Sequence, residues 1–245
     1  MLLEPRGDVD WTKVKQVLKT IYQQSPEFLF ENALIGGGAA WFYKTVLNKA
    51  NDPDFKIELN PQKEILWLSK DIDFIGSNLN EYEVLLKTKK TGTPPRFYIE
   101  GVWIDTPEIG LTMHPDVVLK RTYQGYLEQD LGEYQVAHPA DVLKEKLALV
   151  NSPKATKRPQ DILHIEAIKE FIKFDLCQRI EKKELFQNAA DAKAWRDDAI
   201  LAKTVDWTIF SCSKLQRRLE VAYQNLESVS YSNSVRQWIK HHLKS

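Results

Sequence analysis

A run of three glycines joins a strand-like segment to a helix-like segment early in the chain. Gly36, Gly37 and Gly38 follow the apolar residues Ala33-Leu34-Ile35 and precede a helix-like segment over residues 39–47. Glycine has no side chain, so backbone amides at the start of a helix can approach an anion closely. We therefore predict that these glycines contact phosphate, and the alternative is a tight turn without a ligand.

Two common phosphate motifs do not fit these glycines. A dinucleotide-binding fingerprint needs a third glycine at position 41, where Trp41 stands. A P-loop needs a glycine directly before Lys44-Thr45, where Tyr43 stands. The phosphate site must therefore be of another kind.

A pair of aspartates follows the last glycine after an interval of 32 residues. Asp71 and Asp73 lie in an apolar segment that continues to Ile75, and Ser69 precedes them. Side chains two residues apart on a strand point to the same face. Magnesium prefers oxygen ligands, so we predict a magnesium site at Asp71 and Asp73. The alternative is a solvent-facing strand end with two incidental acids.

A third acid is expected on a later strand. Residues 96–105 are rich in β-branched and aromatic side chains and predict strand structure, with Gly101 as either a bulge or a turn. Asp105 ends this segment and is our first choice for the third acid. Glu100 is the alternative.

In this order, the motifs resemble those of the nucleotidyltransferase superfamily, whose members have a polymerase-beta-like core. The similarity is greatest to abortive-infection-type bacterial stand-alone enzymes. A second match lies at residues 142–149 and 157–162, which are similar to a pair of helices in that group. The matches together cover about residues 30–170, with residues 48–65 interpreted as an insertion.

The resemblance implies the transfer of a nucleoside monophosphate from a nucleoside triphosphate (NTP) to an acceptor hydroxyl, with Mg²⁺. Asp71, Asp73 and Asp105 would be the catalytic and metal-binding residues. The resemblance also implies nucleotide-binding residues, namely Gly36, Gly37, Gly38, Ser69, Lys146 and Asp161. Lys146 is otherwise a lysine at the domain edge, and Asp161 an acid favoured in the first turn of a helix.

The two halves of the chain differ in their patterns. A helix is predicted near residues 11–22, with Asp10 as its N-cap, and another over residues 81–90. From about residue 141 the pattern is helical, near 141–150, 160–176, 178–190, 191–203, 206–226 and 233–243. We predict an α+β fold: a mixed sheet flanked by helices over residues 1–140, then a mainly α-helical domain over residues 141–245 that completes the cleft.

Composition narrows the range of partners and compartments. Lys+Arg and Asp+Glu are both 34, so no overall charge attracts nucleic acid or an acidic membrane. The basic residues around Arg158 are interpreted as a solvated loop, with nucleic-acid contact as the alternative. The two cysteines and the absence of a signal-peptide or membrane-spanning pattern lead us to expect a cytoplasmic protein that does not contact a membrane.

The acceptor is left open, as RNA, protein or a small molecule. The resemblance favours an RNA or toxin-like role, as in toxin–antitoxin systems. A second hypothesis is a catalytically silent nucleotide-binding or antitoxin-like module that acts through a protein partner. A third is a helical interaction protein in which the aspartate pair is accidental.

Overall fold

The computed structural model describes residues 7–50, 67–76, 82, 96–107, 110, 112–127, 132–152 and 158–182. The chain divides into two compact units, one comprising Met1–Lys49 and Ile57–Ile168, the other Ala50–Lys56 and Lys169–Ser245. The sheet and α7 belong to the first unit. The domain boundary expected near residue 140 stays a prediction.

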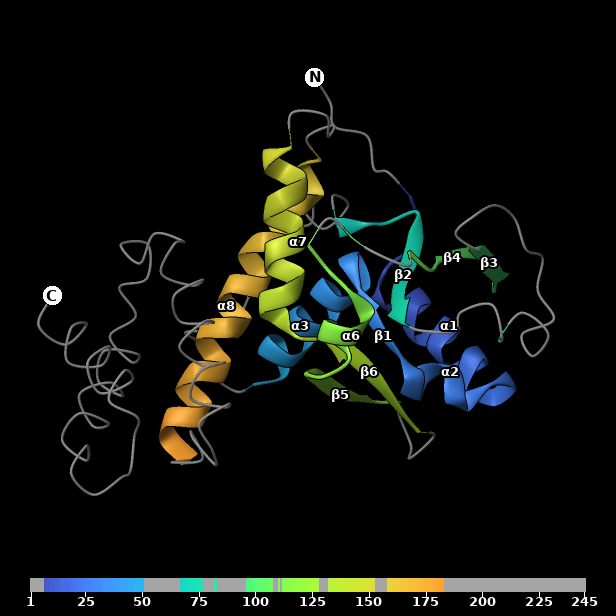
Figure 1. The fold of residues 1–245 in the computed structure, drawn as a ribbon, viewed down its shortest axis with the longest axis horizontal. Coiled ribbons are helices and arrows are strands. Elements are labelled where there is room, and N and C mark those ends of the chain that lie inside the picture. The colour runs from blue at the N-terminus through green and yellow to red at the C-terminus, as the bar shows by residue number, and fades with distance from the viewer. Residues whose placement is uncertain are drawn as a thin grey trace, which may run out of the picture. The chain divides into compact units, whose positions relative to one another are not determined.

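Two helices open the described chain (Figure 1). The first is α1, Trp11–Gln24, and Asp10 caps it as predicted, because its Oδ1 accepts a hydrogen bond of 2.8 Å from the Lys13 amide. The second is α2, Pro26–Glu31, which the sequence analysis did not predict. Its signal is Pro26 at the first helical position, after Ser25.

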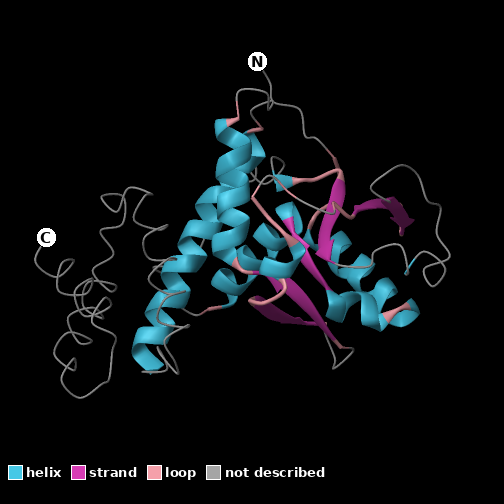
Figure 2. Ribbon diagram, in the orientation of Figure 1, coloured by secondary structure: helices cyan, strands magenta, loops and turns pink. Residues whose placement is uncertain are grey.

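A six-stranded mixed sheet forms the centre of the first unit (Figure 2). Its strands are β1 (Asn32–Ile35), β2 (Asp71–Gly76), β3 (Arg96–Ile99), β4 (Val102–Asp105), β5 (Thr122–Tyr126) and β6 (Glu133–Ala137). Their order across the sheet is β3-β4-β2-β1-β6-β5. The pairs β2–β4 and β1–β6 are parallel, and the other neighbouring pairs are antiparallel.

Helices cover this sheet. The helix α3, Gly36–Lys49, packs against β1, β2 and β6, and α1 packs against both α3 and α2. The contacts bury the largest core side chains, including those of Phe28, Trp67 and Phe74. The predicted α+β fold with a mixed sheet flanked by helices is confirmed.

Three local features show where the fold agrees with the sequence-based predictions and where it differs from them. Gly101 lies in a tight turn between β3 and β4, with a positive φ of 79°, so it is a turn rather than a bulge. Ser69 lies outside β2 and pairs with Val9 through two backbone hydrogen bonds, and Lys70 is at a bend, so β2 begins only at Asp71. The strands β5 and β6 were not predicted, although their aromatic residues and the intervening Gly132 are typical of a hairpin.

Three further helices are described, one between β4 and β5 and two after β6. A short helix, α6, spans Pro115–Val118, and the longer helices are α7, Pro139–Asn151, and α8, Pro159–Lys182. The prediction of separate helices ending at 176 and starting at 178 is wrong, because α8 continues to Lys182. The predicted helix over 81–90, apart from Tyr82, and the helical segments beyond residue 182 lie outside the described residues. Within the described part, none of the helices combines the length and the apolar character needed to cross a membrane.

Candidate functional site: an acidic sheet edge facing a glycine-initiated helix

Three carboxylates come together where β1 and β4 end, on the neighbouring inner strands β2 and β4. We call this group, Asp71, Asp73 and Asp105, the acidic edge. Asp73 on β2 is in register with Asp105 on β4, and these two strands are parallel neighbours. Asp71 lies two residues before Asp73, while Ile72 between them is buried on the opposite face. Neighbouring strands are about 4.8 Å apart, so register partners lie side by side. Asp105, our first choice for the third acid, therefore lies next to the aspartate pair.

Glu100, the alternative third acid, lies elsewhere. It is in the turn before β4, at the other end of the strand from Asp105, with a positive φ of 52°. Its carboxylate accepts hydrogen bonds from Gln16 Nε2 at 2.8 Å and from Thr20 Oγ1 at 3.1 Å, both on α1. These contacts tie the β3–β4 turn to α1 and separate Glu100 from the acidic edge.

The three glycines begin α3 directly in front of this edge. Ile35 is in register with Asp73, so the chain passes from β1 into the first turn of α3 beside the Asp73 carboxylate. Gly36 has a φ of 61°, and a Cβ atom placed there would lie 2.5 Å from Asp73 Oδ2. Both the backbone conformation and the close approach of Asp73 therefore require glycine at this position.

Gly37 and Gly38 are buried and make room for side chains of the protein itself. A Cβ atom at Gly37 would lie 2.6 Å from Ser69 Oγ, and one at Gly38 would lie 2.7 Å from a methyl carbon of Leu34. The glycines belong to the helix, whereas the sequence analysis placed them before it. Only Gly36 of the three is partly exposed. The predicted phosphate contact is therefore most accessible at Gly36.

Burial and mutual repulsion dominate the electrostatics of the aspartate pair. Burial is the largest cause that raises the pKa of Asp73, to about 7, and the charges of Asp71 and Asp105 add to it. The pKa of Asp71 is also raised, first by burial and then by Asp105. The carboxylates thus carry negative charge that their surroundings do not fully compensate. Such a site favours a cation.

Two cations oppose this repulsion from the helical side. The charges of Lys146 on α7 and Arg158 before α8 lower the pKa values of both Asp71 and Asp73. Lys146 is buried, and its Nζ donates a hydrogen bond of 2.7 Å to Asp161 Oδ1. The two residues predicted separately at 146 and 161 therefore form one ion pair, in which Asp161 holds the lysine in place.

Arg158 and Arg96 are site residues that the sequence analysis missed. The sequence predicts that Arg158 lies in a solvated basic loop. It nevertheless stands three residues before Asp161, within the segment 157–162 that resembles the nucleotidyltransferase helix pair. Arg96, on the edge strand β3, forms an ion pair with Asp105, and its Nη2 lies 3.9 Å from Asp71 Oδ2. No signal in the sequence identified Arg96, because its pairing depends on the antiparallel register of β3 and β4.

The carboxylates have the oxygen chemistry that magnesium prefers, and their raised pKa values fit a site for positive charge. In the described ranges, no group of three His, Cys, Asp or Glu side chains is arranged to hold a metal ion. The Asp105 carboxylate accepts a hydrogen bond from Arg96 Nε. Asp71 and Asp73 thus fit a cation as they stand, and Asp105 is engaged by an internal cation.

A buried histidine lies beneath the glycine turn. His164 on α8 is 1% exposed, and its Cε1 would be 3.3 Å from a Cβ atom at Gly37. Burial and then the charge of Lys146 lower its pKa well below the usual range. The nearby Trp67 backbone acts in the opposite direction and raises the pKa, although neither ring nitrogen has a partner at hydrogen-bond distance within the described part of the chain. His164, to which the sequence analysis assigned no role, therefore packs as a neutral ring, 5.0 Å from that of Trp67.

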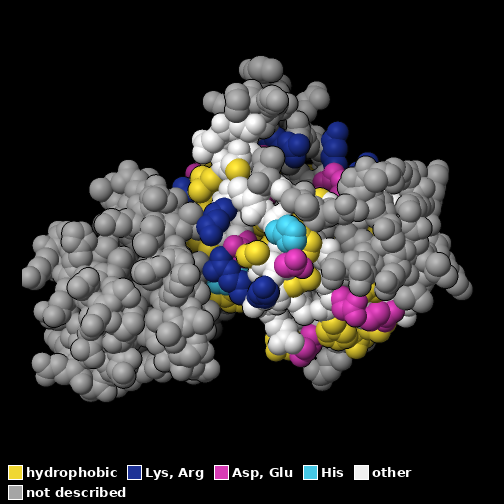
Figure 3. Space-filling model, in the orientation of Figure 1, with side chains coloured by type: hydrophobic (Ala, Val, Ile, Leu, Met, Phe, Trp, Pro, Cys, Tyr) yellow, Lys and Arg dark blue, Asp and Glu magenta, His cyan; other side chains and the backbone are white. Residues whose placement is uncertain are grey.

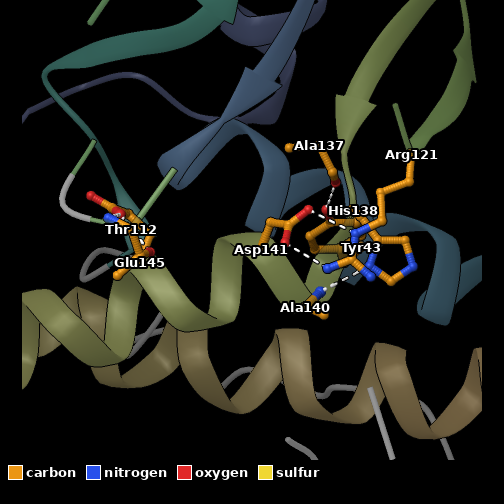
Figure 4. A network of polar contacts seen from close by, with 8 residues as sticks. All are labelled: Tyr43, Thr112, Arg121, Ala137, His138, Ala140, Asp141 and Glu145. Carbon is orange, nitrogen blue, oxygen red and sulfur yellow. Dashed lines mark hydrogen bonds and ion pairs between the residues drawn. The ribbon is translucent and has the colours of Figure 1, made fainter. Parts of the chain in front are cut away.

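A second polar network fixes the start of α7 (Figure 4). Arg121 donates two hydrogen bonds to the buried Asp141 carboxylate, at 3.0 Å to Oδ2 and 2.6 Å to Oδ1. The Tyr43 hydroxyl donates to the Ala137 carbonyl, and His138 caps the helix.

On the face of the molecule drawn in Figure 3, basic, acidic and histidine side chains are interspersed.

No family model and no curated protein matches the sequence. Among solved structures, the chain is similar to an antigenic nucleotidyltransferase-like protein from Paracoccidioides brasiliensis, with a TM-score of 0.39 and 14% sequence identity. The match covers 71% of this chain and 89% of that one. The likeness is distant.

Proposed function

We propose that this protein is a magnesium-dependent nucleotidyltransferase. It would transfer a nucleoside monophosphate from an NTP to an acceptor hydroxyl and release pyrophosphate. One observation carries the proposal. Asp71, Asp73 and Asp105 lie on neighbouring strands at one sheet edge, directly in front of the helix that starts at Gly36. Incompletely compensated carboxylates next to a helix N-terminus suit a cation and a phosphate group together.

Asp71 and Asp73 would hold magnesium, and Asp105 would join them once it is released from Arg96. Bound magnesium would screen the triphosphate charges and stabilise charge on the attacking and leaving oxygens. Asp105 would also accept the proton of the acceptor hydroxyl as its oxygen attacks the α-phosphorus. The bond from the α-phosphorus to the bridging oxygen breaks, and pyrophosphate leaves.

The triphosphate would lie between the start of α3 and the cations of the helical side. Gly36 and the Ser69 hydroxyl would contact it at the helix N-terminus, while Gly37 and Gly38 shape the turn. Lys146 and Arg158 would bind phosphate oxygens, and Asp161 would position Lys146 through their ion pair of 2.7 Å. Rate enhancement would come mainly from positioning and from fixed charge.

The acceptor is an open part of the proposal. The sequence resemblance to abortive-infection-type enzymes favours RNA and a toxin-like role, with a protein or a small molecule as the other candidates. The chain has 34 basic and 34 acidic residues, so its net charge does not attract RNA. An RNA acceptor would therefore have to bind through a local patch.

A catalytically silent nucleotide-binding module, acting through a protein partner as antitoxins do, is the second candidate. One observation favours it, namely the ion pair between Arg96 and Asp105. If Arg96 stays on Asp105 when nucleotide is bound, only Asp71 and Asp73 remain to hold metal. This candidate predicts NTP binding without release of pyrophosphate.

The test is to incubate the pure protein with each radiolabelled NTP, magnesium and total cellular RNA, and to follow label and pyrophosphate. We expect labelled RNA and a stoichiometric amount of pyrophosphate, both lost in Asp73→Ala. Asp116→Asn, which changes an exposed aspartate on α6, is the matched control and should retain transfer. Pyrophosphate without labelled RNA would indicate another acceptor. Neither product, with NTP still bound, would contradict the transferase and favour the silent module.

A further inference from the structure

A cavity of about 630 Å³ lies between α1, α3 and the β5–β6 hairpin. This volume is in the range of small-molecule sites. Phe42, the lining residue of α3 nearest the glycine turn, stands six residues after Gly36, which corresponds to about 9 Å along a helix. The lining continues to Lys49, at the other end of α3. The cavity is therefore separate from the acidic edge.

The charge of the lining has one sign. Lys15, Lys19 and Lys49 line the cavity, and the described lining residues include no aspartate or glutamate. Lys15 and Lys19 are four residues apart on α1, so they share one face of the helix and repel each other. In a chain whose formal net charge is zero, a concave site lined by three lysines is a local attraction for an anion.

Aromatic rings form much of the remaining wall. Phe42 and Tyr134 are buried and pack edge to face, with ring centroids 6.2 Å apart. Trp11 is partly exposed, and Tyr126 is 68% exposed although it is a large aromatic residue. An exposed aromatic ring beside a cavity offers a face on which a flat ring can stack.

Together these features specify the class of ligand. The lysines require an anion of high charge density, and the aromatic residues favour a flat ring, ideally in the same small molecule. We infer that the cavity between α1, α3 and the β5–β6 hairpin binds a nucleoside monophosphate, as a second site separate from the acidic edge. The inference does not depend on the proposed transferase activity.

The test uses Asp73→Asn protein in EDTA, so that magnesium-dependent binding at the acidic edge does not contribute. The four common nucleoside monophosphates are titrated by calorimetry, with adenosine and ribose 5-phosphate as probes that lack the phosphate or the base. We expect one saturable site for at least one monophosphate. Both partial probes should bind at least tenfold more weakly than AMP if AMP is that ligand.

Charge reversal within α1 supplies a matched pair of variants. Lys19→Glu should weaken binding at least tenfold, whereas Lys13→Glu, on the same helix but outside the lining, should change it less than twofold. Circular dichroism would establish that both variants fold. The absence of saturable binding by all four monophosphates, or equal losses in the two variants, would overturn the inference.

The position of the ligand is tested by photolabelling with an azido derivative of the monophosphate that binds, followed by peptide mapping. Label on the peptides of α1 or β5 is expected. Label on residues 36–38 would place the ligand at the acidic edge and overturn the inference. If the protein transfers no nucleotide but is labelled in α1, the proposed function is contradicted and the second site is supported.

Discussion

Carboxylates in two regions of the described structure are wholly or partly buried, and their charges are balanced differently in the two regions. At the start of α7, Asp141 is buried but receives two hydrogen bonds from one arginine, Arg121. At the sheet edge, burial raises the pKa values of both Asp71 and Asp73, Asp105 raises both further, and the charge of Asp71 raises the pKa of Asp73. The compensating cations come from other elements. One carboxylate is fully paired within the protein, and the other group is incompletely compensated.

This difference separates a structural from a functional use of the same chemical group. A paired carboxylate such as Asp141 contributes to the stability and specificity of the fold. A group of carboxylates that repel each other costs stability, so its presence is best explained by a cation bound in the working state. We therefore expect loss of the Arg121 charge to destabilise the protein and loss of the Asp73 charge to stabilise it.

The largest change in stability is expected for Arg121→Ala. This variant leaves the Asp141 carboxylate buried without its bidentate partner, which typically costs about 3 kcal/mol of the free energy of unfolding. Urea denaturation followed by circular dichroism measures the change. Lys120→Ala, at the exposed neighbouring position, is the control and should change the value by less than about 0.5 kcal/mol. Equal effects of the two variants would mean that the Asp141 pair is not structural.

Gly36→Ala should have the next largest effect, a loss of about 2 kcal/mol. About 1 kcal/mol comes from the positive φ, and the rest from the contact of the new methyl group with the Asp73 carboxylate. Gly101→Ala is the matched control, because Gly101 also has a positive φ but, among the described residues, its Cβ would meet only Tyr98 Oη, at 3.9 Å. Gly101→Ala should lose about 1 kcal/mol and retain magnesium-dependent nucleotide binding, whereas Gly36→Ala should lose that binding.

Asp73→Asn should stabilise the protein in the absence of metal. Folding raises the pKa of Asp73 from 3.8 to about 7, so the folded state holds the proton more tightly. This contribution favours folding at low pH and is lost as the pH rises through about 7. Asparagine does not ionise, so its advantage should grow between about pH 4 and pH 7 and then stay constant. Because Asp73 is partly exposed, solvent screening limits the gain to about 1 kcal/mol.

Urea denaturation of both proteins in EDTA, at pH 4.5 and pH 8, measures this difference. A gain that is the same at both pH values would show that the charge of Asp73 is not the cause. A loss of stability at pH 8 would contradict the account of the acidic edge as an uncompensated group.

Local patterns in the sequence were sufficient to predict much of the fold. The apolar spacing of α1 and its Asp10 cap, and the apolar segments of β1 and β2, depend on neighbouring residues and were predicted correctly. The hairpin of β5 and β6 was missed, because its strands are short and mix polar with aromatic residues. The break predicted at residue 177 was wrong, since nothing at that position interrupts α8 before Lys182.

The candidate site was predictable where it depends on strand alternation. The spacing of Asp71 and Asp73 determines that they share a face, and Asp105 was chosen because it ends a strand. The pairing of Lys146 with Asp161 joins two helices, and that of Arg96 with Asp105 depends on the β3–β4 register, so neither follows from local sequence. Which ligand these residues bind stays a prediction.

The most direct test of the central claim is calorimetric titration of the four NTPs into wild-type protein, in magnesium and again in EDTA. The account predicts that at least one NTP binds more than tenfold more tightly with magnesium. It also predicts that Asp73→Asn removes this difference while Asp116→Asn keeps it. NTP affinity that is the same with magnesium and with EDTA, or unchanged in Asp73→Asn, would contradict the assignment of the acidic edge as a metal and nucleotide site.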